Sequence, residues 1–441
     1  MTFAYKFPPM NEFTLDTGLT VICLPDHEQD GLVLAVQLPV GRFSDPVGRE
    51  GLCELTAGLL SKGSRSFSSE EFAERIENAG AAIFFEIGEE HSMIGLRTLA
   101  SAASSLVPLF VEMVTGPSFA KEEFVRLQRE MITAVKAEAV DPSILATRHF
   151  YAEIAGRGHP AGRFQTVQSL KAITIRDVEE FFNQYFSPRE SFCIAAGDVE
   201  HDRLRRLIAE QLSFWKRPMA RRALPAPSVR HPRKMVVRLV NKPDSTQASL
   251  AIGHAAPGEL CTGREALFLA NHIFGSANFS SRLMTRIRTA DGKTYGVSSQ
   301  LLSETEFGTF LVTTSTRNNR LAEVAGSIIE EYRRFCSDGV TAGELEKAKR
   351  FATGNMAFQL EGIGNVVDKL LWLRFYGRPN AYIERFAESI AAVTIDFVNE
   401  TIRRHFSAEN LIMIVVGKRA EIEPQLKAFG PIRNFHFRDK I

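Results

Sequence analysis

Thr174-Ile175-Arg176-Asp177-Val178, followed by Phe186-Ser187 and Gly197, returns later in the chain as Thr394-Ile395-Asp396-Phe397-Val398, Phe406-Ser407 and Gly417. Each recurring residue lies 220 positions after its counterpart, without a gap. Upstream, Glu123-Phe124 corresponds to Glu344-Leu345 at a spacing of 221, so one small insertion separates the copies. A repeat of this length indicates that the 441 residues form two tandem homologous domains.

A proline-rich and basic segment separates the two copies. Residues 216–234 contain four prolines and seven lysines or arginines, which is typical of an extended, solvated linker. A nucleic-acid-binding patch would instead interleave basic and aromatic residues, and this segment does not. We therefore predict an N-terminal domain over residues 1–215 and a C-terminal domain over residues 235–441.

The hydrophobic periodicity predicts an α+β fold for each domain. In the first domain, apolar or alternating runs predict strands, and apolar residues three or four apart predict helices. The predicted strands are 15–24, 32–40, 82–87, 92–100 and 191–197, and the predicted helices are 51–62, one that carries Phe72 and Ile76, 102–114, 121–140, 143–155 and 174–185. We expect a mixed, mostly antiparallel sheet in each domain, with helices packed on one face and the other face lining a cavity.

The composition argues against several classes of protein. The formal net charge is +1, from 53 basic and 52 acidic side chains, which does not favour binding to nucleic acid or to an anionic membrane. The five cysteines are scattered without metal-ligand spacing, as is typical of reduced thiols in a reducing compartment. No apolar run reaches the length of a membrane span or a signal peptide. We expect a soluble, cytoplasmic protein, or a periplasmic one if a leader has been removed.

Residues 280–297 combine a helical pattern, an Asp-Gly turn and a strand pattern. Arg288 falls at the end of the predicted helix and Tyr295 at the start of the strand, so a cation and a phenol hydroxyl can converge on one point. Two donors fixed in this way suit a peptide carbonyl, or the oxyanion that it becomes during attack. The alternative is an arginine at a helix edge and a half-buried core tyrosine.

The repeat and this motif together resemble the pitrilysin/insulysin family of zinc peptidases over nearly the whole chain. The residues similar to the family's Gly-Ser-Arg-Leu, Leu-Arg and Tyr signature are Phe274-Gly275, Ser281-Arg282-Leu283, Ile287-Arg288 and Tyr295. By length the chain is similar to the small bacterial processing peptidases and the mitochondrial processing peptidase subunits, which pair two such chains. The resemblance implies that Arg288 and Tyr295 bind the peptide at the zinc. It also implies a candidate substrate loop at Phe274, Gly275 and Ser276, shorter and poorer in glycine than the loop of the mitochondrial non-catalytic subunit.

The zinc motif of that family, His-x-x-Glu-His, is not kept in this chain. In the corresponding helix, Glu54 stands at the first histidine position, Ala57 at the general-base glutamate and Gly58 at the second histidine. A catalytic zinc needs three protein ligands and a water, with a carboxylate nearby to take the proton of that water. The sequence therefore predicts no metal in this chain and no peptidase activity of the chain alone, with zinc expected in a partner subunit.

The helix that should supply a third zinc ligand is also changed. Thr133 and Ala134 stand where the family has glutamates, and Glu130 and Glu138 are predicted to lie off that face.

Two other segments are candidates for the missing chemistry. Glu89-Glu90-His91 has the tail of the inverted motif, but Glu86 stands at its first histidine position, so we interpret this segment as a solvated strand end. Cys53 is a conceivable nucleophile, but without a histidine in the local sequence to activate it we interpret it as a buried structural thiol.

The resemblance implies a non-zinc-binding subunit of a heterodimeric metalloendopeptidase. In this interpretation a homologous partner chain with an intact His-x-x-Glu-His supplies zinc and the general base, and Arg288 and Tyr295 bind a peptide substrate. The alternative is a purely structural subunit, like the respiratory-complex core proteins of the same family. A third alternative, an enzyme with unrelated chemistry in the cavity, has no supporting group of residues in the sequence.

Overall fold

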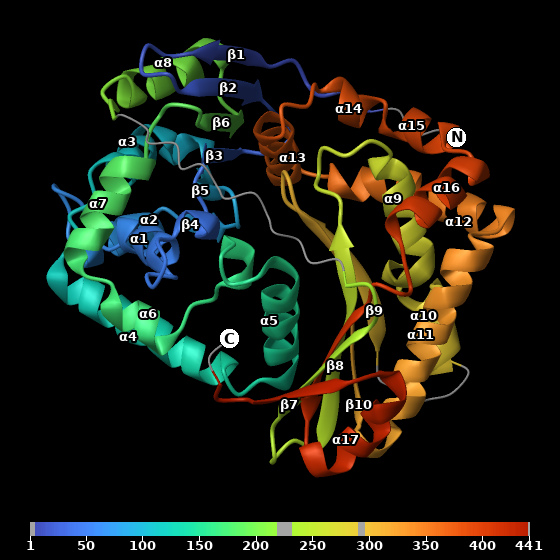
Figure 1. The fold of residues 1–441 in the computed structure, drawn as a ribbon. Coiled ribbons are helices and arrows are strands. Elements are labelled where there is room, and N and C mark those ends of the chain that lie inside the picture. The colour runs from blue at the N-terminus through green and yellow to red at the C-terminus, as the bar shows by residue number, and fades with distance from the viewer. Residues whose placement is uncertain (1–4, 218–231, 290–295, 440–441) are drawn as a thin grey trace.

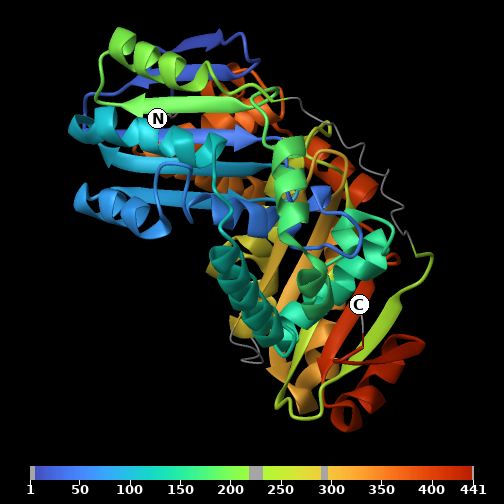
Figure 2. The same ribbon diagram turned by 90° about the vertical axis from the view of Figure 1, so that its left-hand side faces the viewer.

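The computed structural model describes residues 5–217, 232–289 and 296–439. Within these residues the chain forms two six-stranded sheets, one in each half of the sequence. Figure 1 shows the first half in blue to green and the second half in yellow to red. In the turned view of Figure 2, the strands of the first sheet run across the picture and those of the second run steeply downward, so the two sheets are strongly inclined to each other.

The two sheets share one topology. The strands of the first sheet are β1 Asn11–Thr14, β2 Thr20–Pro25, β3 Gly31–Leu38, β4 Ala82–Ile87, β5 Ser92–Leu99 and β6 Phe192–Gly197, and those of the second are β7 Val236–Asn241, β8 Gln247–Ala256, β9 Val297–Ser303, β10 Gly308–Arg317, β11 Ile412–Gly417 and β12 Ile432–His436. Their orders are β1-β2-β6-β3-β5-β4 and β12-β7-β11-β8-β10-β9. The pairs β2–β6 and β7–β11 are parallel, and their neighbours β3 and β8 pair antiparallel to them. Only the edge strands differ, because β1 is antiparallel to β2 whereas β12 is parallel to β7.

Helices of the first half cover one face of the first sheet. These helices are α1 Leu52–Leu60, α2 Ser69–Asn78, α3 Ala103–Thr115, α4 Lys121–Glu138, α6 Val167–Ala172, α7 Ile175–Tyr185 and α8 His201–Leu212, while α5 Pro142–Ala155 lies apart from them. Leu32, Leu34 and Val36 of β3 point into this core, because alternate residues of a strand face the same side. Each predicted helix of this half is present.

The second half repeats this arrangement. Its helices are α9 Arg264–Asn271, α10 Arg282–Met284, α11 Leu321–Asp338, α12 Ala342–Gln359, α13 Ile363–Phe375, α14 Ala381–Glu384, α15 Phe386–Ala392, α16 Ile395–His405 and α17 Arg419–Leu426, with π-helices at His272–Ser276 and Thr285–Thr289. Short 3-10 turns occupy Arg42–Ser44, Ala100–Ala102, Pro160–Gly162, Asn278–Ser280, Asn318–Arg320 and Lys427–Phe429. Met413 and Val415 of β11 face this second helix-covered core.

The remaining face of each sheet carries a helix from the other half. Val33 and Ala35 of β3 pack against α13 of the second half, and Ile412, Ile414 and Val416 of β11 pack against α5 of the first half. Figure 1 shows the orange α13 beside the blue strands and the teal α5 beside β7 and β8. This exchange corrects in part the expectation that the second face lines a cavity: a helix covers much of that face, while Leu302 and Thr309 at the end of the second sheet do line one. It also explains why β3 and β11 are apolar on both sides, as strands buried on both faces are.

The α+β fold class with two repeated units is confirmed. Of the predicted linker, residues 218–231 lie outside the described part of the chain. In the described part, no helix is both long enough and apolar enough to cross a bilayer.

Candidate functional site

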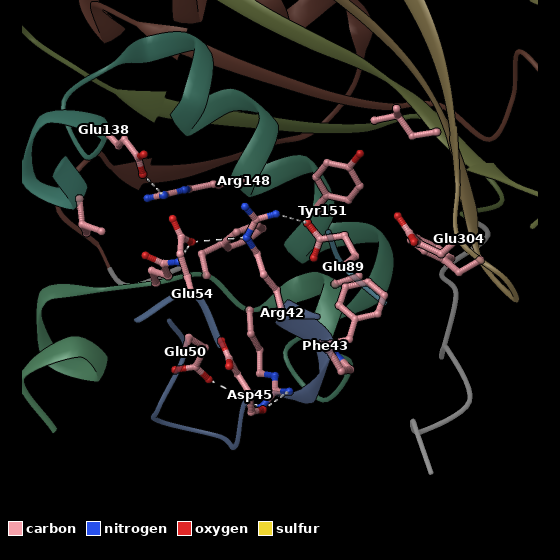
Figure 3. Close-up of a pocket in the computed structure, with 18 of the residues that line it drawn as sticks. Arg42, Phe43, Asp45, Glu50, Glu54, Glu89, Glu138, Arg148, Tyr151 and Glu304 are labelled. Carbon is pink, nitrogen blue, oxygen red and sulfur yellow. Dashed lines mark hydrogen bonds and ion pairs between the residues drawn. The ribbon is translucent and has the colours of Figure 1, made fainter. Parts of the chain in front are cut away.

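A cavity of about 590 Å³ lies between the two halves of the chain. Its walls come from the segment 42–54, from α4 and α5, from residues 160–165 and from the β9–β10 hairpin at residues 302–309. Figure 3 shows Glu54, Arg42 and Glu89 near its centre, with Tyr151 above them and Glu304 facing them from the hairpin. The exchange of α5 between the halves therefore builds this site, since α5 provides both Arg148 and Tyr151.

The degenerate metal-motif positions lie on α1, and one of them reaches this cavity. Glu54 lines the cavity and accepts a hydrogen bond from Gln165 Nε2 at 2.5 Å, and its carboxylate lies 3.6 Å from Arg42 Nε. Ala57 is buried. At Gly58, an added Cβ would come within 2.9 Å of Leu127 Cδ2 of α4, so a larger residue there would require the Leu127 side chain to shift. The motif positions are thus occupied by one carboxylate that is already bonded and by two residues packed against neighbours.

The α4 residues at and near the expected third-ligand position face different surroundings. Thr133 is exposed and donates its hydroxyl hydrogen to the carbonyl of Arg129 at 2.9 Å. Ala134 lines the cavity, and so does Glu138 one turn later. The expectation that Glu138 lies off this face is therefore wrong, because residues four apart on a helix share a face. Its carboxylate is paired with Arg148.

These residues do not fit a zinc ion. Within the described residues, no three side chains of histidine, cysteine, aspartate or glutamate come together in a group that could hold a metal. Glu54 and Glu138 are each engaged with an arginine, and a guanidinium beside a carboxylate opposes the binding of a cation there.

The start of α1 shows why this helix is kept although its metal motif is lost. Gly51 has φ +105°, a left-handed conformation that favours glycine, and a Cβ there would lie 2.6 Å from Leu170 Cδ2. Asp45 accepts the backbone N–H groups of Gly51 and Cys53 at 2.7 Å each and so caps the helix. Burial raises the pKa of Asp45 to about 7, although these N–H groups oppose the shift. Cys53 is fully buried with a pKa raised well above its ordinary value by burial, so its thiol is structural, as expected.

The segment Glu89-Glu90-His91 is not a solvated strand end, which corrects that interpretation. Glu89 lines the cavity and bonds to Arg42 Nη1 at 3.4 Å. Glu90 accepts hydrogen bonds from the backbone N–H and the hydroxyl of Thr305, at 2.8 and 2.7 Å, and so ties the first half to the β9–β10 hairpin. The ring of His91 packs on Phe375 of α13. The local pattern was uninformative here because all these partners lie far away in sequence.

The second candidate region contains Arg288. It belongs to the π-helix Thr285–Thr289, but its side chain is not described, and Tyr295 lies outside the described residues, so the convergence of the pair remains a prediction. The segment before it is firmly held. Leu283 and Ile287 are fully buried, and Arg282 binds Glu344 through two hydrogen bonds of 2.6 and 2.7 Å.

The candidate substrate loop is a π-helix rather than a loop. The ring of Phe274 is fully buried against Phe310 and Phe335, and Gly275 is buried where a Cβ would lie 2.4 Å from Ser299 Oγ. Only Ser276 of the three residues is exposed. The prediction that Phe274 and Gly275 face a substrate is therefore wrong for this conformation, because both side-chain positions point into the core.

Sequence reasoning missed several residues of the cavity. These are Arg42, Asp45, Arg148, Tyr151, Arg163, Glu304 and Phe307. They are scattered over the first 163 residues and the β9–β10 hairpin, and none belongs to a short motif. The one signal that the sequence offers is the pair of acidic residues in the short polar segment Glu304-Thr305-Glu306.

Comparison with known proteins agrees with this architecture. Residues 172–351 match the family model of the peptidase M16 inactive domain. An uncharacterized zinc protease of Mycobacterium leprae is 26% identical over 402 residues, which cover 88% of this chain and 87% of that protein. A non-peptidase homologue of Helicobacter pylori is 22% identical over 386 residues, with 86% of this chain and 87% of that protein covered.

A solved structure is similar over almost the full length. The crystal structure of a peptidase M16 inactive domain from Pseudomonas fluorescens superposes with a TM-score of 0.86 at 21% identity, covering 93% of this chain and 98% of that one. Residues 172–351 thus carry an M16 inactive-type domain, and the chain as a whole is similar to a zinc protease and to a solved M16 inactive-domain structure, in agreement with the resemblance to the pitrilysin family.

Proposed function

We propose that this chain is the non-zinc-binding subunit of a two-chain metallopeptidase, and that it supplies Arg288 and Tyr295 to a peptide bound at the zinc of a homologous partner. The main support for the proposal is the set of side chains at the metal-motif positions of α1. Glu54 is bonded to Gln165, Ala57 is buried and Gly58 has no side chain, so these three positions offer one carboxylate where a catalytic zinc needs three ligands.

The anchoring of the Arg288 segment supports a binding role in this proposal. Arg282, Leu283 and Ile287 fix the turn before Arg288 through a bidentate ion pair and two fully buried side chains. A donor that is held in place before the substrate arrives stabilises a developing oxyanion without reorganisation. Arg288 binds the scissile carbonyl and Tyr295 donates its hydroxyl to the same oxygen, while the partner's zinc supplies the activated water.

The experiment is reconstitution of the chain with a homologous subunit that carries His-x-x-Glu-His. Tyr295→Phe removes one hydroxyl, so we expect turnover to fall by roughly a hundredfold with assembly unchanged. Arg288→Ala should lower kcat and raise KM, because a cation on the ground-state carbonyl contributes to binding as well as to turnover. Activity is compared between complexes of equal folded fraction.

Two results would contradict the proposal. If the chain alone retains one zinc after dialysis and cleaves peptides in a chelator-sensitive way, it is an enzyme by itself. If both variants keep the activity of the parent complex, the chain is a scaffold subunit and Arg288 and Tyr295 have no part in substrate binding.

A further inference from the structure

The cavity between the halves contains more acidic than basic groups. Six carboxyl groups and three guanidinium groups line it: Asp45, Glu50, Glu54, Glu89, Glu138 and Glu304, with Arg42, Arg148 and Arg163. Each arginine has an acidic partner. Arg42 lies between Glu54 and Glu89, Arg148 pairs with Glu138, and Arg163 lies 3.6 Å from Glu50.

None of these three arginines pairs with Glu304. Asp45 is satisfied by two backbone N–H groups, whereas Glu304 is hydrogen-bonded to Glu90 and faces the charges of Glu89 and Glu259. Burial first, and then these carboxylates, raise the pKa of Glu304 to about 8. Among the ion pairs of the described residues, none involves Glu304, whereas Glu89 and Glu259 each pair with an arginine. Glu304 therefore holds a proton when no ligand is bound, and a cation bound beside it would favour loss of that proton, because an opposite charge stabilises the ionised carboxylate.

The neighbours of Glu304 are already occupied. Glu90 accepts two hydrogen bonds from Thr305, and Glu259 pairs with Arg264 at 2.8 Å and with Arg378 at 3.7 Å. Figure 3 shows Glu304 facing Tyr151 and Glu89 across the cavity.

Hydrogen bonds on both sides hold the hairpin that carries Glu304. The backbone N–H of Glu304 donates to the carbonyl of Phe307 at 2.7 Å, and the N–H of Glu259 donates to the carbonyl of Glu304 at 2.8 Å. Because Thr305 is also bonded to Glu90 of the first half, the carboxyl group of Glu304 is held at the cavity wall before any ligand arrives.

Aromatic rings line the same cavity. Phe43, Tyr151 and Phe307 are among its wall residues, and the ring of His159 joins Phe43 to Phe307 with centroid distances of 5.6 and 5.8 Å. The faces of such rings attract cations, and more strongly where water is excluded. A volume of about 590 Å³ lies within the range of sites for small ligands.

We propose that this cavity binds an organic cation, with an ammonium or guanidinium group against Glu304 and its alkyl chain between Tyr151 and Phe307. The chemistry fits two sources, the lysine or arginine side chain of a peptide and a free polyamine. A metal ion is not favoured, because no group of three potential metal ligands exists in the described residues, and hard cations require several oxygen ligands at once. This proposal does not depend on the role proposed for Arg288, because it concerns binding by this chain alone, without a zinc-binding partner subunit.

Calorimetric titration of the full chain at low salt tests this. The probes are Ac-Ala-Ala-Arg-Ala-Ala-amide, the same peptide with glutamine in place of arginine, and spermidine. The structure predicts that the arginine peptide or spermidine binds at least about tenfold more tightly than the glutamine peptide, and that Glu304→Gln weakens this binding by about tenfold or more. Glu306→Gln changes an exposed carboxylate of the same hairpin that does not line the cavity, and should alter the affinity by less than about twofold.

A second variant keeps the test independent of Glu304. Tyr151→Leu preserves much of the side-chain volume but removes the ring, so it should weaken cation binding by about three- to tenfold. Binding of the arginine peptide without spermidine identifies a peptide side chain as the ligand, and the reverse identifies a polyamine. The proposal is overturned if neither cation binds, if the glutamine peptide binds equally well, or if Glu304→Gln binds like the parent chain.

Discussion

Removal of the Arg282 side chain tests whether the Arg288 segment is held by the Arg282–Glu344 pair. Arg282 donates to both carboxylate oxygens of Glu344 at 2.6 and 2.7 Å and to the carbonyl of Gly339 at 2.8 Å, and its guanidinium lies 5.5 Å from the ring centre of Phe335. Burial tends to raise the pKa of Glu344, but the hydrogen bonds from Arg282 and from the Thr341 N–H outweigh it and lower that pKa. Arg282→Ala would leave this carboxylate without its main partner.

The exposed fractions of the Arg282 and Glu344 side chains determine how much stability Arg282→Ala should remove. Loss of one partner costs about 3–5 kcal/mol in a buried ion pair but only about 0–1 kcal/mol in an exposed one. Arg282 is 17% and Glu344 30% exposed, so we expect Arg282→Ala to lower the free energy of unfolding by about 2–3 kcal/mol. For a domain of this size the loss corresponds to roughly 5–9 °C in Tm. Arg282→Lys keeps the charge but not the bidentate geometry and should cost about half as much.

Differential scanning calorimetry measures these values, and the chain offers a matched control. Arg286 lies in the neighbouring π-helix and pairs with Glu330 at 3.3 Å, but these side chains are 40% and 49% exposed. Arg286→Ala should therefore change the stability by less than about 0.5 kcal/mol. If Arg282→Ala destabilises the protein no more than Arg286→Ala does, the reasoning that Arg282 anchors this segment is wrong.

Two further outcomes are expected. Glu304 keeps its proton up to about pH 8 in the folded chain, whereas its ordinary pKa in the unfolded chain is 4.5, so the free energy of unfolding should fall by about 1–2 kcal/mol as the pH rises between these values, after allowance for partial exposure. Glu304→Gln should remove this contribution to the pH dependence of denaturant unfolding. If the variant keeps the full pH dependence of the parent chain, Glu304 is not its source. Leu370 of α13 is fully buried against the first sheet, so Leu370→Ala should lower the free energy of unfolding by about 2–4 kcal/mol and lower the Tm of both halves together. Leu260→Ala, at a half-exposed position, should leave the stability nearly unchanged. If calorimetry shows two separate transitions and Leu370→Ala shifts only one of them, α13 does not couple the halves.

Much of the fold was predictable because its signals are local. The recurrence of residues 174–197 at 394–417 predicts two homologous units, and the two sheets have matching strand orders. The helix over residues 51–62 follows from Leu52, Leu55 and Leu59, all of which are buried on one side of α1. Such periodicities report which face of an element avoids water, and this requirement acts within a few residues of the chain.

Only one property of the candidate site could be predicted from the sequence, namely which side chains stand at the positions of the metal motif. The absence of zinc ligands at Glu54, Ala57 and Gly58 is a matter of side-chain chemistry and needs no coordinates. The misreading of Glu89 and Glu90 has the opposite origin. Both are acidic residues beside a strand, a pattern typical of a solvated turn, but their partners Arg42 and Thr305 lie 47 and 215 residues away in sequence.

The sequence by itself determined the repeated α+β units, the loss of the metal motif and the apolar character of both sides of β3 and β11. Only the tertiary structure decided what covers those strands, since α13 and α5 each cross to the sheet of the other half. That exchange brings Tyr151 and Glu304 to one cavity. The physical reason is that hydrophobic patterning encodes how much surface an element must bury but not which distant surface buries it, because packing energy depends on shape and area rather than on position in the chain.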